Sequence, residues 1–205
     1  MIEGRVVGEL ESNCYLFVCD ETKKAAIIDP GGDGVMIYHW VLEKGVEVEY
    51  ILLTHGHIDH IAAVDELRHL LKAKVAIHTA DAEMLTNPQY NQSIYIGFPV
   101  AFEPADILLN DGDVINVGKE NLKVISTPGH SLGGVCFLTR EGLFSGDTLF
   151  SGSIGRTDLR GGSLKQLLNS VRQKLFVLPA DTRVFPGHMD ETTIARELAF
   201  NPFFY

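Results

Sequence analysis

Residues 54–60, Thr-His-Gly-His-Ile-Asp-His, place three imidazoles and one carboxylate directly after an apolar run that is expected to form a strand. Neutral imidazole nitrogens and carboxylate oxygens are ligands that zinc, iron and manganese accept. One turn cannot easily direct all four donors at a single ion, but it can give two of them to one ion and two to a neighbouring ion. The segment therefore predicts a dinuclear metal site at the end of a strand.

Three further residues of ligand type occur later, each after an apolar run and in a tight turn: His130, Asp147 and His188. In open α/β sheets, ligands bind in the crevice beyond the carboxyl ends of the strands, so residues far apart in sequence can meet there. Asp29 follows a similar run without a neighbouring histidine, and we expect it to hold a turn or to support a metal ligand. The alternative for Asp59 is that it only caps the helix that follows.

Short apolar runs alternate with helical patterns along the whole chain, and no linker rich in proline, serine or charge divides it. This pattern predicts an α/β fold and a single domain over residues 1–205. One amphipathic helix is expected after His60 and another after Ser163. Residues 86–104 lack a clean period and are expected to form a long loop. Strands are predicted at residues 15–19, 25–28, 50–54, 74–78, 114–117, 122–126, 134–139, 142–145 and 183–185.

The charge balance and the cysteines narrow the classes of partner. With 17 Lys and Arg against 27 Asp and Glu, the formal net charge of −10 disfavours contact with nucleic acid or a membrane surface, both of which reward a basic face. No apolar run approaches the ~20 residues that cross a bilayer, and no secretory signal is visible, so a cytoplasmic location is expected. The three cysteines are not in CxxC spacing, which disfavours a cysteine zinc site. A small molecule is the expected partner.

The complete His-x-His-x-Asp-His pattern and the later ligand-type residues resemble the metallo-β-lactamase fold superfamily and, within it, the glyoxalase II-like hydrolases. The resemblance runs from Asn13 to His188. It implies a four-layer αβ/βα sandwich, in which two sheets pack together between outer helices. It also implies two ligand sets joined by a bridging residue: His55, His57 and His130 for one metal, Asp59, His60 and His188 for the second, and Asp147 between them.

Details of the pattern favour one branch of this superfamily. The zinc β-lactamases with Cys at the position of Asp147 differ from this chain, which disfavours β-lactam hydrolysis. Residues 150–159, Glu197 and residues 201–203 resemble the short bacterial glyoxalase II-like branch. The longer glyoxalase II enzymes grip glutathione with a C-terminal helical domain, whereas this sequence ends at Tyr205, so the resemblance leaves glutathione recognition open.

Two divalent ions, with zinc favoured and iron or manganese as alternatives, would lower the pKa of a shared water enough to supply hydroxide near neutral pH. A thioester suits such a site because a thiol of pKa about 8.5 departs readily as thiolate. The prediction is therefore a thioester hydrolase of the hydroxyacylglutathione hydrolase type, with Asp59 holding the second metal and orienting the hydroxide. Arg156 is the predicted contact for a substrate carboxylate; its alternative is a pair with Asp158 that fixes their own loop.

Other activities stay open on this fold. Persulfide dioxygenases share the histidine pattern and a segment like residues 155–158, but use one iron held by residues matching His55, His130 and Asp147. The residues after His188 resemble the hydrolases more closely. Lactone hydrolysis would use the same hydroxide. A non-catalytic metal-binding module predicts degraded ligand positions, and all seven positions are intact.

Overall fold

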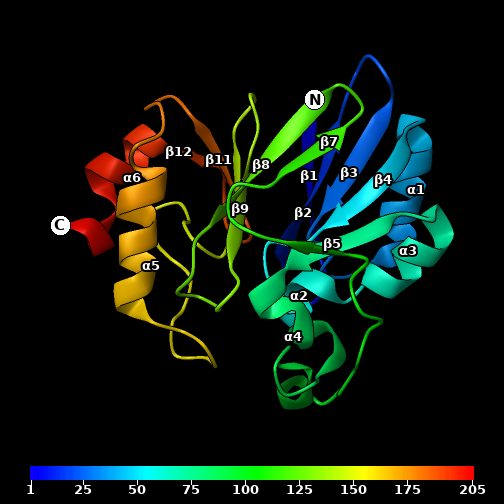
Figure 1. The fold of residues 1–205 in the computed structure, drawn as a ribbon, viewed down its shortest axis with the longest axis horizontal. Helices are drawn as coiled ribbons and strands as arrows, with labels where there is room; N and C mark the ends of the chain where they lie inside the picture. Colours follow the sequence, from blue (N-terminus) through cyan, green and yellow to red (C-terminus); the bar gives the residue numbers. More distant parts are fainter.

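The computed structural model describes residues 1–205 and consists of two six-stranded sheets that pack face to face (Figure 1). The first sheet runs in the order β1 (Ile2–Val7), β2 (Ser12–Val18), β3 (Lys24–Ile28), β4 (Glu47–Leu52), β5 (Lys74–His78) and β6 (Ile107–Leu109). The second runs in the order β12 (Thr192–Thr193), β11 (Arg183–Pro186), β10 (Leu143–Gly146), β9 (Val135–Leu138), β8 (Glu120–Ser126) and β7 (Val114–Val117). Strands β3 to β6 are parallel to one another, as are β10 and β11, and the other neighbours are antiparallel.

Helices cover the outer face of each sheet (Figure 1). The first sheet is covered by α1 (Gly34–Lys44) and α3 (Val64–Leu71), and the second by α5 (Leu164–Ser170), its π-helical continuation (Val171–Leu175) and α6 (Ile194–Phe200). The shorter elements are α2 (Ile58–Ile61), α4 (Ala82–Thr86) and 3₁₀ turns at Thr79–Asp81, Ser93–Ile96 and Pro202–Phe204. None of the helices combines the length and the apolar character that crossing a bilayer requires.

The alternation of side chains along the strands builds three apolar cores. In β2, Cys14, Leu16 and Val18 pack toward the helices of the first layer, whereas Tyr15 and Phe17 pack against the second sheet. Because both faces of this strand are buried, its sequence is one continuous apolar run rather than an alternation. A third core lies between the second sheet and α5. The four-layer αβ/βα sandwich that the resemblance implied is confirmed.

The predicted elements agree with the structure unevenly. Strands β5 and β7 begin and end at the predicted residues. The helix predicted after His60 is present as α3, but it begins only at Val64, because α2 ends at Ile61 and the N–H of Ala63 donates to the carbonyl of Pro30 at 3.0 Å. The helix after Ser163 is confirmed, and the Ser163 hydroxyl accepts a hydrogen bond from Gln166 N. The prediction missed β1, β6, β12, α1, α4 and α6.

The long loop predicted over residues 86–104 is present, except that Thr86 ends α4 and Ser93–Ile96 form a 3₁₀ turn. Buried Asn91 fixes it, donating to the carbonyl of Val100 at 3.0 Å and accepting from Ile58 N at 2.8 Å. Two of its aromatic residues, Tyr95 and Phe98, are 75% and 77% exposed. The loop is thus tied directly to the segment that carries the candidate metal ligands.

Buried Glu197 ties α6 to the turn at Gly152. Its carboxylate accepts hydrogen bonds from Gly152 N at 2.7 Å, from the Thr192 hydroxyl at 2.6 Å and from the Asn201 amide at 2.9 Å. The Glu197→Ala variant would leave these buried donors unpaired, and we expect the free energy of unfolding to fall by about 3 kcal/mol in urea titrations. The Glu191→Ala variant, which removes an exposed pair with Arg183, is the control, and an equal loss in both variants would contradict this role for Glu197.

Candidate metal centre

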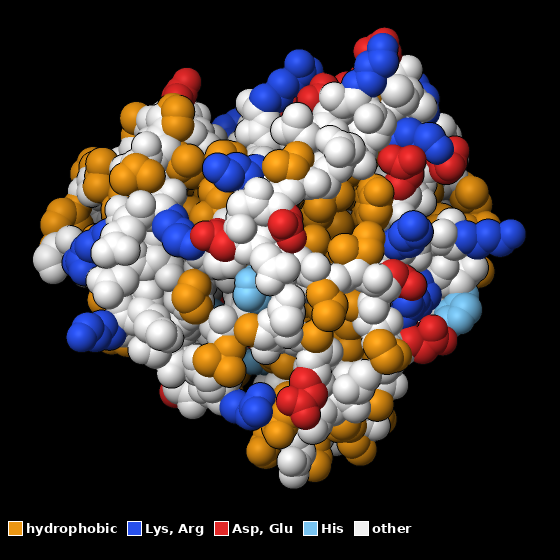
Figure 2. Space-filling model, in the orientation of Figure 1, with side chains coloured by type: hydrophobic (Ala, Val, Ile, Leu, Met, Phe, Trp, Pro, Cys, Tyr) orange, Lys and Arg blue, Asp and Glu red, His pale blue; other side chains and the backbone are white.

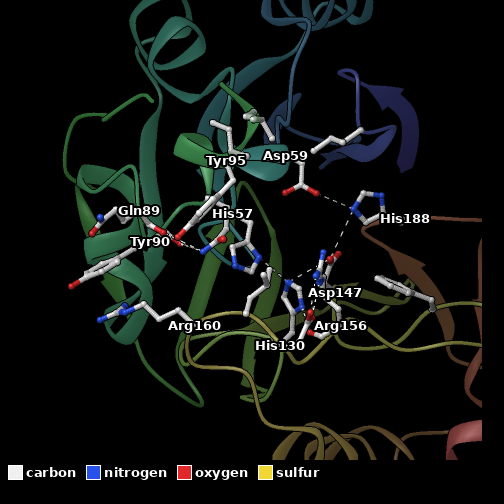
Figure 3. A pocket seen from close by; sticks show the side chains of 17 residues that line it. His57, Asp59, Gln89, Tyr90, Tyr95, His130, Asp147, Arg156, Arg160 and His188 are labelled. Carbon is white, nitrogen blue, oxygen red and sulfur yellow. Dashed lines mark hydrogen bonds and ion pairs between the residues drawn. The ribbon is translucent and has the colours of Figure 1, made fainter. Parts of the chain in front are cut away.

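All seven predicted metal ligands lie together at one edge of the two sheets. Figure 3 shows those that line an open cleft: His57, Asp59, His130, Asp147 and His188. They come from the segments that follow four strands: His55, His57, Asp59 and His60 after β4, His130 after β8, Asp147 after β10 and His188 after β11. In the space-filling view, histidine side chains are visible at the floor of a hollow near the centre of the face (Figure 2). The convergence expected from the ends of the strands is therefore present.

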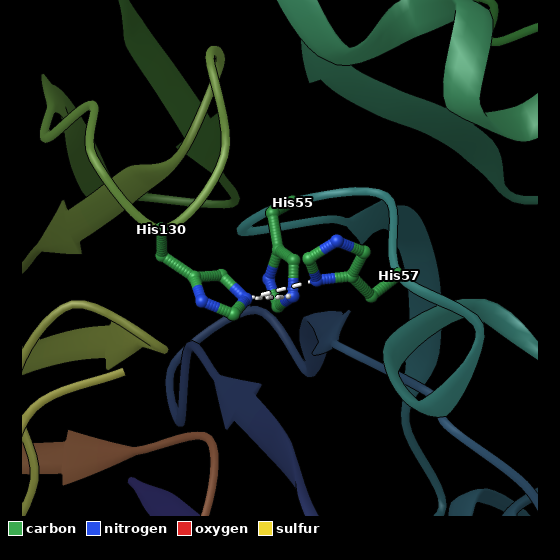
Figure 4. A group of neighbouring side chains, drawn as sticks. All are labelled: His55, His57 and His130. Atoms are coloured by element: carbon green, nitrogen blue, oxygen red, sulfur yellow. Dashed lines mark hydrogen bonds between the residues drawn. The ribbon is translucent and has the colours of Figure 1, made fainter. Parts of the chain in front are cut away.

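Three histidines form the first group, with their rings turned toward a common point (Figure 4). His57 Nδ1 lies 2.9 Å from His130 Nε2, which lies 3.2 Å from His55 Nε2. Nitrogens bound tetrahedrally to zinc at their usual distance would be about 3.3 Å apart. The spacing of this group is thus close to what one metal ion requires.

Neighbours behind the rings fix which nitrogen faces the cluster. His130 Nδ1 lies 2.7 Å from the carbonyl of Arg156, and a carbonyl can only accept, so we assign the proton to Nδ1. His60 Nδ1 lies 3.0 Å from the carboxylate of Asp29 and is assigned a proton for the same reason. In their neutral forms, both rings then present the lone pair of Nε2 to the cluster, which is the form that binds a metal.

Asp59, His60 and His188 form the second group. His188 Nε2 lies 3.2 Å from Asp59 Oδ2, and His60 Nε2 lies 3.7 Å from the same oxygen. Asp59 is in the first turn of α2, but its side chain makes contacts with histidines rather than a capping hydrogen bond. The capping alternative for Asp59 is not what the structure shows.

Asp147 lies between the two groups. Its Oδ1 is 3.3 Å from His60 Nε2, and its Oδ2 is 3.5 Å from His130 Nε2 and 3.9 Å from His188 Nε2. One carboxylate therefore reaches histidines of both groups. This is the location that the resemblance implied for a bridging ligand.

Three buried atoms of the cluster have no hydrogen-bond partner: Nε2 of His57, Nε2 of His60 and Oδ1 of Asp147. The last two face each other at 3.3 Å, and both are acceptors when the His60 ring is neutral. Burying unpaired acceptors is costly, and a cation between them removes that cost. The chemistry of these donors and their lack of protein partners show that the cluster is suited to binding metal.

The electrostatics of the cluster suit a positive charge among its carboxylates. Burial lowers the pKa of His55 well below its ordinary value and lowers the pKa of His57 to about 3, so both rings are neutral. Burial alone would lower the pKa of His60, but Asp147 and Asp59 outweigh it and raise that pKa, so without metal the ring carries a proton on Nε2 that a metal ion would replace. Burial alone would also raise the pKa of Asp59 and Asp147, but the charge of His60 outweighs it and holds both pKa values low. Both carboxylates are therefore ionised.

Asp29 supports this cluster from behind. It accepts hydrogen bonds from the backbone N–H of Thr54 at 2.8 Å, from the Thr54 hydroxyl at 2.6 Å and from His60 Nδ1 at 3.0 Å. The Thr54 hydroxyl in turn lies 3.2 Å from His55 Nδ1. The prediction that Asp29 supports a ligand matches these contacts, whereas the part played by Thr54 was missed.

Asp81 was also missed. Its buried carboxylate accepts hydrogen bonds from the Ser131 hydroxyl at 2.6 Å and from Gly133 N at 2.7 Å, and so holds the loop that begins at His130. Burial raises the pKa of Asp81 above its ordinary value. Because 50 residues separate Asp81 from Ser131, no local pattern in the sequence indicates this contact.

The cluster opens into a cleft of about 950 Å³. Residues 89–96 and 156–160 contribute to its walls, as the long loop and the turn after β10 come together there. Arg156 lines this cleft, but its guanidinium makes two hydrogen bonds of 2.8 Å to the carboxylate of Asp158. This is the pairing expected if Arg156 fixes its own loop, and contact of Arg156 with a substrate stays a prediction.

Comparison with known proteins agrees with this geometry. A family model described as the metallo-beta-lactamase superfamily matches residues 7–188. Probable metallo-hydrolase YqgX of Bacillus subtilis is 40% identical, over 96% of this chain and 94% of its own length. Hydroxyacylglutathione hydrolase GloC of Haemophilus influenzae is 34% identical, over 98% of this chain and 97% of its own.

Two solved structures resemble this chain over nearly its whole length. The crystal structure of BLEG-1 B3 metallo-beta-lactamase is 40% identical and covers 100% of this chain and 99% of its own, with a TM-score of 0.95. TTHA1623 in a di-iron-bound form is 34% identical and covers 98% of this chain and 99% of its own, with a TM-score of 0.87. With the fold, the ligand cluster and the family model in agreement, this chain belongs to the metallo-beta-lactamase superfamily.

Proposed function

We propose that this chain hydrolyses a small-molecule thioester with two divalent metal ions, of which zinc is favoured. The observation that carries the proposal is the position of Asp147, whose carboxylate oxygens reach histidines of both ligand groups at the floor of an open cleft. The similarity to hydroxyacylglutathione hydrolase GloC supports thioesters as the substrate class. The di-iron form of TTHA1623 supports iron as the alternative metal.

Metal ions bound at this cluster would supply hydroxide near neutral pH and stabilise negative charge on the carbonyl oxygen of the substrate. The oxygen of water then forms a bond to the carbonyl carbon, the carbon–sulfur bond breaks, and the products are a carboxylate and a thiol. Asp59 is ionised and faces the cleft, where it can orient the attacking oxygen by accepting a hydrogen bond from it. The leaving thiolate needs little help from an acid because the pKa of a free thiol is about 8.5.

Persulfide oxidation is the second candidate, because His55, His130 and Asp147 also form a set of two histidines and one carboxylate. That activity needs only one ion. The second group, Asp59, His60 and His188, is complete and equally compact, which favours the dinuclear hydrolase.

The test is anaerobic release of thiol from S-lactoylglutathione by protein reconstituted with zinc, iron or manganese. We expect release by the wild type and a loss of more than about 100-fold in the His188→Ala variant, because loss of a supporting residue alone costs 10–100-fold. Metal content should fall from two ions to one. The exposed residue His69 lies outside the cluster, so the His69→Ala variant should keep both properties.

Two outcomes would contradict the proposal. Absence of thiol release, together with oxygen uptake on glutathione persulfide that survives in the His188→Ala variant, would assign the dioxygenase activity instead. Hydrolysis of a chromogenic cephalosporin at a higher kcat/KM than any thioester would make the chain a β-lactamase, as the name of its structural relative BLEG-1 suggests for that protein.

A further inference from the structure

The cleft wall carries one guanidinium that no carboxylate neutralises. Arg156 and Arg160 both line the cleft, but Arg156 is held by Asp158 through two hydrogen bonds. The side chain of Arg160 forms no ion pair and no hydrogen bond; its guanidinium carbon lies 3.4 Å from the centre of the Tyr90 ring. Figure 3 shows Arg160, Tyr90 and Gln89 on one side of the cleft and His188 on the other. A positive charge is thus available to a ligand across the cleft from the second ligand group.

The aromatic ring of Tyr90 holds the guanidinium of Arg160 in place by stacking against it. A guanidinium stacked on an aromatic face keeps the N–H groups at its edge free to donate, and their fork matches the geometry of a carboxylate. The next residue, buried Asn91, accepts a hydrogen bond from Ile58 N, one residue before Asp59. Tyr90, on which Arg160 stacks, is therefore connected through Asn91 to the segment that holds the metal ligands.

The neighbourhood of Arg160 suits a polar arm that ends in an anion. The side-chain amide of Gln89 also lines the cleft and makes no hydrogen bond within the protein, so it is free to pair with an amide of a ligand. On the far side of Ile58 and Asp59, a second cavity of about 600 Å³ has a different character. Its wall is apolar and acidic, with the residues Leu10, Ala62, Ile96, Phe98, Glu9 and Asp33.

The two cavities differ in charge and polarity, and this difference would orient a bound thioester. An uncharged acyl group fits the apolar cavity, whose carboxylates repel anions, and this leaves the thiol half of the molecule on the side of Arg160. We propose that Arg160, seated on Tyr90, binds a carboxylate on the thiol half of the substrate and so selects thioesters of anionic thiols. This inference rests on the proposed thioester hydrolysis and names the residue that sets its specificity.

The test compares two thioesters that differ only in charge: the S-propionyl derivatives of 3-mercaptopropionic acid and of 3-mercaptopropionamide. For the wild type we expect a kcat/KM about 10-fold or more higher for the acid, since a hydrogen bond to a charged group is worth that much in binding. In the Arg160→Gln variant the ratio of the two kcat/KM values should fall to about 1, with the change in KM rather than kcat. The Arg160→Lys variant should restore part of the ratio.

Variants of Tyr90 and of a comparable arginine outside the cleft serve as further tests and as a control. Tyr90→Leu should lower the ratio and Tyr90→Phe should keep it, because only the aromatic face is required. Arg172 is also exposed and lies over an aromatic ring, that of Phe204, outside the cleft, so Arg172→Gln should leave the ratio unchanged. If the wild type cleaves both thioesters equally, or if Arg160→Gln keeps the ratio, the inference is wrong while thioester hydrolysis stands. If the wild type cleaves neither, the inference is wrong, and thioester hydrolysis fails with it only when S-lactoylglutathione is also left intact.

Discussion

The Asp147→Ala variant is expected to lose thioester hydrolysis by more than about 100-fold and to bind less metal than the wild type. Asp147 reaches His60 through one oxygen and His130 through the other, so its removal deprives both ligand groups at once. Residues that only support a ligand already cost 10–100-fold in metal affinity or activity when they are replaced. Thiol release under anaerobic conditions and elemental analysis of the dialysed protein measure the two effects.

A matched aspartate makes this result specific. Asp181 is exposed and lies outside the cluster, so the Asp181→Ala variant should keep wild-type activity and metal content. The loss in Asp147→Ala should exceed that in His188→Ala, since His188 belongs to one group only. An Asp147→Ala protein that retained two tightly held ions would show that this carboxylate is not the bridge.

Replacing Asp29 by Ala is expected to weaken both the fold and the metal site. The substitution leaves the buried N–H of Thr54 and Nδ1 of His60 without an acceptor, and each unpaired buried donor costs about 1–3 kcal/mol. The Asp29 backbone also has φ of 52°, a left-handed conformation that Ala adopts less readily than Asp. We expect the metal-free protein to lose about 3 kcal/mol of unfolding free energy and the metal affinity to fall 10–100-fold.

The Asp33→Ala variant separates the effect of the backbone conformation from the effect of the lost hydrogen bonds. Asp33 has nearly the same backbone conformation, with φ of 53°, but it is exposed and accepts one hydrogen bond, from Gly8 N. The Asp33→Ala variant therefore carries a similar backbone cost without touching a metal ligand. Urea unfolding of the metal-free proteins and competition with a chelator measure stability and affinity. Equal metal affinities in the two variants would rule out support of His60 by Asp29.

The sequence predicts the ligand cluster well because its signal is local. The candidate ligands lie in the segments that follow apolar runs, and strands that run in the same direction bring their carboxyl ends to one edge, so His130 and His188 could be placed near His55 without coordinates. Helix α1 also had a local signal that was overlooked, since Ile37, Trp40 and Val41 recur at helical spacing and are all buried.

Other features could not have been predicted from local pattern. The break before α3 depends on a hydrogen bond from Ala63 to Pro30, which replaces a bond within the helix. Asp81 meets Ser131 across two segments that share no periodicity. The stacking of Arg160 on Tyr90 likewise joins two irregular segments. In each case the contact is made between residues far apart in the chain, and the residue type alone does not identify its partner.

The distribution of ligands between the two sheets determines when the site can form. The chain through β6 contains His55, His57, Asp59 and His60, yet neither of the two ligand groups is complete until His130 and His188 arrive from the second sheet. A metal ion held by a complete group would therefore bind only after the sheets have met, and its binding energy would stabilise their docking rather than either sheet alone. Removal of the metal by a chelator should accordingly weaken the packing of the two sheets against each other before it affects either sheet.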